Sequence, residues 1–500
     1  MTMKRRLLIE QGGPGHRGPA LPAADVPTQP LAELLPGARL REELRFPQVS
    51  EPEVVRHFVE LSTLNHHIDR GFYPLGSCTM KHNPKINDEI ASLPGFALAH
   101  PLGSDESSQG ALRVIAELQR ALSQITGFAA VTTQPSAGAQ GEMTGLLIIR
   151  AYHRSRGEGE PRRTVIVPDS AHGTNPASVA LVGYETVTIP SEEHATVNLD
   201  ALAKALDDRT AAVMLTVPNT LGLFEPHILE VTRMAHAAGA QVYMDGANLN
   251  ALVGLVRPGD LGFDVMHINV HKTFSTPHGG GGPGAGPVAV ARHLEPFLPV
   301  PVIEEHDGRL RLVHARPQSI GRVHSFHGNF GILVRALAYI TSLGPEGLLQ
   351  VSRTAILNAN YLMRRLARTY ELPHPEPCMH EFVLSGRRLR KHGVKTLDVA
   401  KRLLDFGVHA PTVYFPLIVE EALMIEPTET ETLDRLDHFA EAMERIAREA
   451  VESPAVLRDA PLTTPISRLD EGRAARELTL RWNSDPRPAQ PTPHGTPSRA

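Results

Sequence analysis

The sequence contains little cysteine, no excess of either charge and no long apolar run. Its 500 residues include only two cysteines, Cys78 and Cys378, which lie far apart and outside any metal-ligand spacing. This argues against a disulfide framework and indicates a reducing compartment, so we expect two simple thiols in a cytoplasmic protein. The 50 basic and 55 acidic residues give a net charge of −5, a balance that indicates neither nucleic acid nor an anionic membrane as a partner.

Membrane insertion and secretion are not expected either. No apolar stretch approaches the roughly 20 residues needed to span a bilayer. The basic N-terminus is followed by a short apolar run, but this run ends at Glu10, well short of a signal peptide core. With 41% hydrophobic residues, a chain of this length is instead long enough for two or three packed domains.

The two ends of the chain have unusual compositions. Residues 11–36 are rich in glycine and proline and show no sustained period, which predicts an extended arm. Such arms often cross subunit interfaces, so residues 1–100 are assigned to an arm and an interface segment. Residues 484–500 contain five prolines and almost no large apolar residues, which predicts a disordered tail.

Residues 101–330 alternate helical and extended patterns. Ser108 is the expected N-cap of a helix that Gly127 ends, and a second helix is expected over residues 228–238. Apolar and β-branched runs predict strands at residues 129–133, 164–167, 211–217, 241–245 and 263–270. This alternation predicts a large α/β domain built around a mostly parallel sheet.

Beyond residue 330 the pattern changes to helices interleaved with short strands. An amphipathic run over residues 436–450 predicts a helix, and residues 382–384 predict a strand. Residues 331–483 therefore read as a second, smaller α+β domain.

The predicted strands bring polar residues to one edge of the sheet. In parallel sheets, ligands bind outside the carboxyl ends of the strands. The five segments end in, or lead directly into, residues that could carry chemistry, namely Ser136, His172, Thr216, Asp245 and Lys272. We therefore expect a ligand site at this edge.

Asp245 ends one predicted strand, and Lys272 follows the next predicted strand along the chain. A lysine at the mouth of a buried sheet is poorly solvated, which suits it to Schiff-base formation, although a lone lysine at a strand end is more often an ordinary surface residue. Asp245 alone could be a helix cap or a metal ligand. Together, however, they are typical of pyridoxal phosphate enzymes, in which an acid keeps the ring nitrogen protonated.

Two other parts of this edge fit the same cofactor. Ser136, Ala137 and Gly138 lie between a strand and a helix, where backbone amides and the helix dipole could bind a phosphate. Turns of small residues often only connect a strand to a helix and bind no ligand, but this turn lies at the sheet edge that also carries Lys272. His172 could stack on a pyridine ring or exchange protons. Most of the 25 histidines should be structural, and His172 is singled out by its position alone.

Two compact polar loops outside this pattern are further candidates. One contains Tyr73 and Cys78, and the other contains Ser319 and Arg322. Arg322 could bind a substrate carboxylate through bidentate geometry, although a lone arginine is more often a surface ion-pair residue.

Several long sequence segments match a known family. The chain resembles the glycine cleavage system P-protein, glycine dehydrogenase (decarboxylating), in the form of its separate cofactor-bearing subunit 2. The resemblance covers roughly residues 40–483. The matching words are YPLGSCTMK at 73–81, SAHGTNP at 170–176, DGANLN at 245–250, HKTF at 271–274, SIGR at 319–322, HEFV at 380–383, MIEPTET at 424–430 and RLDE at 468–471.

The resemblance implies an aspartate-aminotransferase-like fold, fold type I of pyridoxal phosphate enzymes, with pyridoxal 5′-phosphate on Lys272. Asp245 would face the ring nitrogen and His172 would stack on the ring. The cofactor-binding set would also include His271, Ala247 and Thr220 beside Ser136, Ala137 and Gly138, and no metal is expected.

The implied reaction is glycine decarboxylation with transfer of the aminomethyl group to the lipoyl arm of H-protein. A 500-residue chain with its own initiator methionine looks like one of two related subunits, so we expect a homologous subunit 1 without the lysine in an α2β2 assembly. Substrate contacts are expected from Arg322, Ser319, Tyr73 and Cys78.

Two departures from the family pattern leave individual contacts open. Val217 stands where a polar residue near the cofactor hydroxyl is expected, and His324 stands where arginine is frequent. Two other functions are also open. One is a different decarboxylation or a transamination by a fold type I enzyme, and the other is a non-catalytic scaffold subunit.

Overall fold

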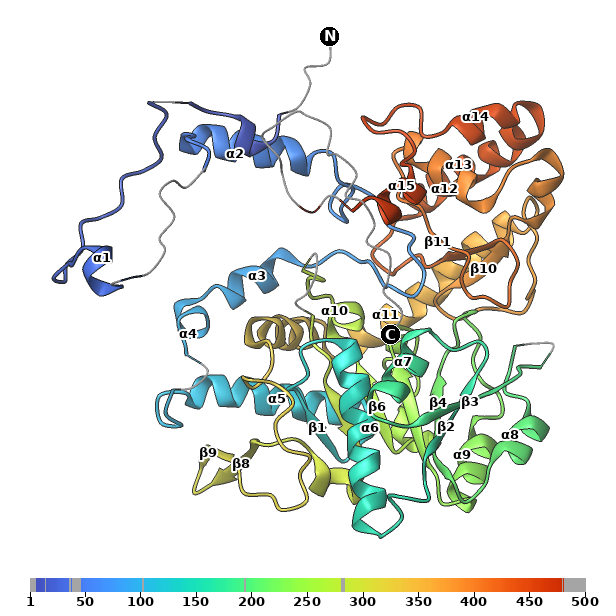
Figure 1. Cartoon of the computed structure of the whole chain (residues 1–500). Coiled ribbons are helices and arrows are strands. Elements are labelled where there is room, and N and C mark those ends of the chain that lie inside the picture. Colours follow the sequence, from blue (N-terminus) through green and yellow to red (C-terminus); the bar gives the residue numbers. More distant parts are fainter. Residues whose placement is uncertain are drawn as a thin grey trace, which may run out of the picture.

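The computed structural model describes residues 6–13, 15–35, 37, 46–100, 103–192, 195–279, 284–478 and 480. The predicted tail at 484–500 and residues 280–282 of the glycine run lie outside this described part. Figure 1 shows a large body formed by the middle of the chain, a smaller body formed by the C-terminal third, and an N-terminal arm that extends away from both.

A seven-stranded sheet forms the centre of the large body. Strand β7 is antiparallel to both of its neighbours, β1 and β6, and the other strands pair in parallel. The prediction of a mostly parallel sheet is therefore confirmed, although β3 and β7 were not anticipated. The strand order is β1 (Ala130–Thr132), β7 (Val288–Val290), β6 (Val265–Ile268), β5 (Gln241–Gly246), β4 (Thr210–Thr216), β2 (Thr164–Pro168) and β3 (Glu185–Ile189).

Helices cover both faces of this sheet, and alternate residues of each strand pack against opposite layers. Met244 of β5 packs in a core with α5 (Gln109–Thr126), α9 (Ile228–Ala237) and the first half of α11 (Phe330–Leu366). Its neighbour Tyr243 packs on the other face with α6 (Gly138–Ser155) and α7 (Thr174–Leu181). This is the period of two that strand geometry imposes.

Two local predictions need correction. Strand β6 ends at Ile268, and Val270–Thr273 form a single helical turn, α10, where the sequence predicted a continuous strand. Ser108 precedes α5 as expected, but its side chain makes no capping hydrogen bond, while Gly127 ends the helix in a left-handed conformation at φ 79°. Gly239, which follows α9, is also left-handed at φ 75°.

The smaller body contains an antiparallel sheet in the order β10 (Phe382–Ser385), β12 (Ala422–Ile425) and β11 (Thr412–Val413). Helix α13 (Leu433–Glu452) buries the apolar side of the predicted amphipathic run against it. The other helices of this part are α12 (Thr396–Asp405), α14 (Pro454–Asp459), α15 (Glu471–Arg476) and the short η5 (Arg387–His392).

Helix α11 connects the two bodies. It changes direction at Gly344 (φ 62°), which Pro345 follows, and it contributes residues to both cores. By length and composition it is apolar enough to cross a membrane, a property that the core helix of a folded protein can share. Its burial in both cores identifies it as a core helix. The domain boundary at about residue 330 stays a prediction, because this helix belongs to both sides of it.

The N-terminal segment contains short helices on an otherwise irregular path. Residues 15–30 are exposed and have no helix or strand, as expected for an arm. The helices are η1 (Leu8–Glu10), α1 (Leu31–Leu34), α2 (Glu51–Ser62), α3 (Lys85–Ala91) and α4 (Pro94–Ala97). The remaining elements of the large body are α8 (Leu199–Ala205), η2 (Leu249–Ala251), η3 (Pro258–Leu261), η4 (Arg292–Phe297) and the hairpin β8 (Val302–His306) and β9 (Arg309–Val313).

Candidate active site

A cavity of about 190 Å³ lies at the carboxyl ends of strands β2, β4, β5 and β6. This is the edge at which parallel sheets bind ligands. Of the residues selected from the sequence, the cavity is lined by Gly138, His172, Thr216, Thr220, Asp245, Ala247, His271 and Lys272. The structure therefore brings together most of the expected cofactor set.

Lys272 lies on the single turn of α10, directly after β6. Its side chain is half-buried, and its Nζ donates a hydrogen bond to the carbonyl oxygen of Ser77 at 2.7 Å. Ser77 belongs to the 73–81 loop and also lines the cavity. The lysine nitrogen is therefore held between the sheet edge and a loop from a distant part of the chain.

Asp245 ends β5 and is buried beneath the cavity. Its carboxylate accepts hydrogen bonds from Asn175 Nδ2 and from the backbone N–H of Ala247, both at 2.9 Å, and His267 Nε2 lies 3.3 Å away. Burial alone would raise the pKa of this carboxyl, but His267, these two donors and Lys272 outweigh it and hold the pKa below its ordinary value. Asp245 is thus an ionised carboxylate inside the protein.

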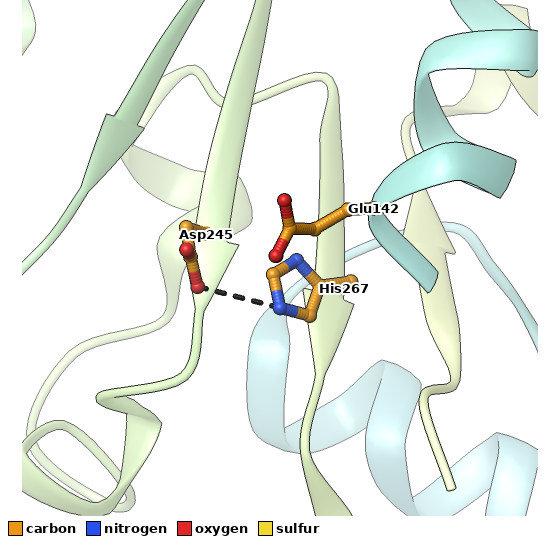
Figure 2. A group of neighbouring side chains, drawn as sticks. All are labelled: Glu142, Asp245 and His267. Carbon is orange, nitrogen blue, oxygen red and sulfur yellow. Dashed lines mark ion pairs between the residues drawn. The ribbon is translucent and has the colours of Figure 1, made fainter. Parts of the chain in front are cut away.

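Glu142 is a second buried carboxyl of the cavity, and the sequence reasoning missed it. It lies on α6, facing Asp245 and His267 (Figure 2), and accepts hydrogen bonds from Thr174 Oγ1 at 2.9 Å and Ser178 Oγ at 3.0 Å. Burial and the nearby Asp245 raise its pKa. Its position one helical turn after Gly138 could have identified it, since residues four apart share one helix face.

His172 lines the cavity beyond the end of β2. Its Nδ1 lies 2.9 Å from the hydroxyl oxygen of Thr174 and 3.2 Å from the backbone nitrogen of the same residue. The edge of the ring contacts Phe415 from the smaller body, with centroids 5.4 Å apart. The imidazole is therefore fixed in orientation from two sides.

His271 also lines the cavity, together with His172 and His267. Burial, then His278 and Lys272, lower the pKa of His271 to about 3, and burial and Lys272 lower that of His278 to about 4. Both imidazoles are therefore neutral at physiological pH.

The turn before α6 differs from the sequence prediction. The backbone N–H and the hydroxyl of Ser136 both donate to Gln140 Oε1, at 2.6 and 2.8 Å, so neither is free as predicted. The cavity is lined by Gly138 and Ala139, and not by Ser136 or Ala137. A Cβ on Gly138 would lie 2.2 Å from Asn269 Oδ1, so only glycine permits this close approach.

The 73–81 loop is held by two buried glutamates of the smaller body. Glu381 accepts the backbone N–H of Ser77 at 2.7 Å, and Glu426 accepts those of Cys78 and Thr79 at 3.0 and 2.8 Å. Both glutamates lie within sequence segments that match the family, but the sequence analysis assigned them no role.

The two side chains of this loop that were expected to contact substrate do not line the cavity. Tyr73 stacks on His409, with ring centroids 3.9 Å apart. Cys78 is half-buried, and burial raises the pKa of its thiol to about 11. Their role in substrate binding stays a prediction.

The 319–322 loop also lies apart from the cavity lining. Arg322 is exposed, and its guanidinium lies 3.3 Å from His314 Nδ1. Ser319 Oγ accepts the backbone N–H of Gly321 within its own turn. The described residues of this single chain therefore provide no contact between Arg322 and the cavity, and its carboxylate-binding role stays a prediction.

Comparison with known proteins identifies the family. The family model of the glycine cleavage system P-protein matches residues 32–402, which is most of the chain. The chain belongs to the glycine cleavage system P-protein family. The model of the C-terminal domain of glycine dehydrogenase matches residues 351–460. The resemblance to this family that the matching sequence segments indicated is therefore confirmed.

Relatives within the P-protein family match over nearly their whole length. A probable glycine dehydrogenase (decarboxylating) subunit 2 from Bacillus velezensis is 56% identical over 477 residues, which cover 95% of this chain and 97% of the relative. A protein of the same name from Chlorobaculum tepidum is 56% identical over 484 residues, which cover 96% of this chain and 99% of the relative.

Solved structures share the fold at low sequence identity. The crystal structure of glycine decarboxylase (P-protein) in inhibitor-bound form is 22% identical, with a TM-score of 0.68, and covers 83% of this chain and 92% of its own. A glutamate decarboxylase from Lactobacillus brevis is 13% identical, with a TM-score of 0.64. The match covers 84% of this chain and 96% of the glutamate decarboxylase chain. The fold is that of fold type I pyridoxal phosphate enzymes, as expected.

The cavity of this P-protein chain fits that cofactor. The first turn of α6 leaves backbone N–H groups without partners inside the helix, and they face a site suited to a phosphate. Two further polar atoms, Thr216 Oγ1 and Asn269 Oδ1, have no hydrogen-bond partner among the described residues. Thr216, which lines the cavity, is polar and lies one position before Val217, where a polar residue was expected. An ionised Asp245 and a lysine complete the set of groups.

Proposed function

We propose that this chain is the cofactor-bearing subunit of glycine dehydrogenase (decarboxylating) and cleaves glycine. Its cofactor is pyridoxal 5′-phosphate. The observation that carries the proposal is one cavity that contains Lys272 and the buried, ionised Asp245 at the end of a parallel sheet. The close relatives, which match over nearly their whole length, carry this activity in their names.

The proposed reaction balances without a further oxidant. Carbon dioxide leaves glycine, and the electron pair of the broken C–C bond forms a new bond from Cα to one sulfur of the lipoyl disulfide of H-protein. The second sulfur takes the electron pair of the S–S bond and a proton. The products are carbon dioxide and a dihydrolipoyl group that carries an aminomethyl group, so the disulfide is reduced by two electrons.

The cavity residues have distinct proposed roles. The cofactor, when bound, supplies an electron sink for the charge that develops on Cα. Lys272 would hold the cofactor, and Asp245, kept ionised by His267 and Asn175, would keep a proton on the ring nitrogen. His172 would cover the ring with an imidazole of fixed orientation, and the first turn of α6 at Gly138 would bind the phosphate.

The proposal includes partners that bind outside this chain. The relatives are named subunit 2, so we expect a homologous subunit 1, in an α2β2 assembly, and lipoylated H-protein as the acceptor. The exposed N-terminal arm supports a role in assembly (Figure 1). We place the reaction in the cytoplasm, which agrees with two free cysteine thiols.

Isotope exchange tests the function directly. The chain is combined with subunit 1, pyridoxal phosphate and lipoylated H-protein, and the incorporation of labelled bicarbonate into glycine is measured. We expect exchange that depends on both glycine and H-protein and that is lost in Lys272→Ala. Absence of exchange with all components present would contradict the proposal. Turnover of other amino acids without H-protein would favour a different decarboxylase or an aminotransferase, and failure to bind the cofactor would favour a scaffold subunit.

A further inference from the structure

Two fully buried glutamates of the smaller body face each other across a strand pair. Phe382 of β10 pairs with Ile425 of β12 in antiparallel register, which places the preceding Glu381 beside the following Glu426. Their side chains are 0% and 1% exposed. Neither contributes to the cavity lining, and neither has a role in the chemistry described above.

Together these glutamates bind three successive residues of the 73–81 loop. Glu381 Oε2 accepts the Ser77 amide, Glu426 Oε2 accepts the Cys78 and Thr79 amides, and Glu426 Oε1 accepts the Thr79 hydroxyl at 2.5 Å. Ser77 and Thr79 adopt left-handed conformations, with φ of 62° and 47°. Such conformations in residues other than glycine persist only where their surroundings hold them. We call this arrangement of Glu381, Glu426 and residues 77–79 the loop clamp.

The loop clamp ends at Lys272. With its amide bound by Glu381, Ser77 turns its carbonyl oxygen toward the cavity, where it accepts the Lys272 Nζ at 2.7 Å. Burial and the nearby Glu426 raise the pKa of Glu381, and burial raises the pKa of Glu426. The positive charge of Lys272 opposes both shifts. His380, which lies beside both carboxyls, has a pKa lowered by burial to about 3 and is neutral.

The proposed reaction explains why the contact between Lys272 Nζ and the Ser77 carbonyl oxygen would matter. Carbon dioxide is the group that leaves Cα, and the aminomethyl product keeps both Cα hydrogens. A lysine nitrogen that is free to approach Cα is a general base able to remove one of these hydrogens, which would divert the reaction toward proton exchange. Lys272 lines the same cavity as the groups that would surround glycine, so its position must be controlled.

We propose that Glu381 and Glu426 are positioning residues that present the Ser77 carbonyl as a docking point for the Lys272 nitrogen whenever that nitrogen is not bonded to the cofactor. The docked lysine stays away from the Cα hydrogens while carbon dioxide leaves. This inference rests on the proposed function, but the docking itself is a property of the chain without cofactor.

The first experiment measures docking in the cofactor-free chain. Trace labelling with acetic anhydride, followed by peptide mass spectrometry, gives the reactivity of Lys272 relative to that of the exposed Lys204. Glu381→Ala and Glu426→Ala should raise the relative reactivity about tenfold or more, the factor that corresponds to one lost charge-assisted hydrogen bond. Glu426→Gln should stay near the native rate, because its amide keeps an oxygen for the two backbone donors. Native reactivity in both alanine variants would overturn the proposal.

A matched control separates docking from general stability. Asp405 is a carboxylate of the same body on a side chain that is 3% exposed. It accepts the Leu462 and Thr463 amides and the Thr463 hydroxyl, and it makes no contact with the 73–81 loop among the described residues. Asp405→Asn should leave Lys272 reactivity unchanged. If the alanine variants do not fold, Thr79→Val removes one clamp hydrogen bond at nearly constant shape. It should raise the reactivity several-fold, and native reactivity would then overturn the proposal.

The second experiment measures the consequence for glycine. With cofactor, subunit 1 and H-protein present, proton NMR in D₂O follows Cα hydrogen exchange, and labelled bicarbonate follows decarboxylation. The ratio of Cα exchange to bicarbonate exchange should rise about tenfold in Glu426→Ala and stay native in Asp405→Asn. An unchanged ratio, despite increased labelling of Lys272, would overturn the protective role. Absence of bicarbonate exchange in the native assembly would instead refute the proposed function and leave docking as measured by labelling.

Discussion

Replacing Lys81 by methionine should strongly destabilise the chain, because Lys81 is a buried cation between the two bodies. Its Nζ, on a side chain that is 1% exposed, donates to Glu429 Oε1 at 2.7 Å, Thr273 O at 2.8 Å and Asn250 Oδ1 at 2.9 Å. Burial alone would lower the pKa of Lys81, but Glu429 and Tyr339 outweigh burial and raise it. Because Thr273 follows Lys272, this contact also supports the turn that carries the cofactor lysine.

The magnitude follows from the geometry of the ion pair. At 2.7 Å and an effective dielectric constant of about 20, the Coulomb attraction is about 6 kcal/mol, and desolvation offsets much of it. Lys81→Met leaves Glu429 buried without its partner, which costs about 3–5 kcal/mol. Glu429→Gln should cost a similar amount. The double variant should cost less than the sum of the two single variants by about 2 kcal/mol, since no unpaired charge remains.

Urea unfolding of the cofactor-free chain, followed by circular dichroism and checked for reversibility, measures these values. With a slope of about 3 kcal/mol per molar urea, Lys81→Met should lower the midpoint by roughly 1–2 M. A cost below about 1 kcal/mol for Lys81→Met, or additive effects in the double variant, would refute the account of Lys81 as a cation held mainly by Glu429.

Three further predictions concern the cavity and its surroundings. Asp245→Asn should retain the cofactor but lower bicarbonate exchange at least about 100-fold, whereas Asp264→Asn, which alters a buried carboxylate just before β6, should not; equal losses would contradict the role of Asp245. His172→Ala should weaken cofactor binding about 2- to 10-fold in equilibrium dialysis, as expected for a lost stacking contact, and unchanged binding would count against stacking. The pKa of the fully buried His380 falls from 6.5 to about 3 through burial and Lys272, so its stabilising contribution is complete above about pH 6.5 and is lost as the pH falls toward 3. His380→Leu should therefore flatten the pH dependence of the unfolding free energy in that window by up to about 1.4 kcal/mol per pH unit, and an unchanged slope would argue against a neutral His380.

The sequence predicted the parts of the site that depend on strand ends. Asp245 and Lys272 could be placed together because parallel strands deliver their carboxyl ends to one edge, whatever the details of packing. Period and turn residues likewise predicted α5 and β5 with nearly correct limits. Strand β7 was missed because three residues after a glycine run are too few to show a period.

The parts that depend on side-chain packing could not be predicted. Ser136 looked free in the sequence, but Gln140, one turn later, folds back onto it. The pairing of Glu381 with Glu426 depends on the register of two strands far apart in sequence. The path of the loop that carries Arg322 is set by tertiary packing, so local pattern gave no indication that this side chain would be exposed.

Lys272 is proposed to hold the cofactor, and chemical trapping shows which lysine does so. The chain is reconstituted with pyridoxal phosphate, reduced with borohydride and digested, and the modified peptide is identified by mass spectrometry. We expect a single pyridoxyl group on Lys272 and none in Lys272→Ala, whose fold is verified by circular dichroism. Modification of a different lysine, such as the buried Lys81, or no stable modification of a folded chain, would contradict it.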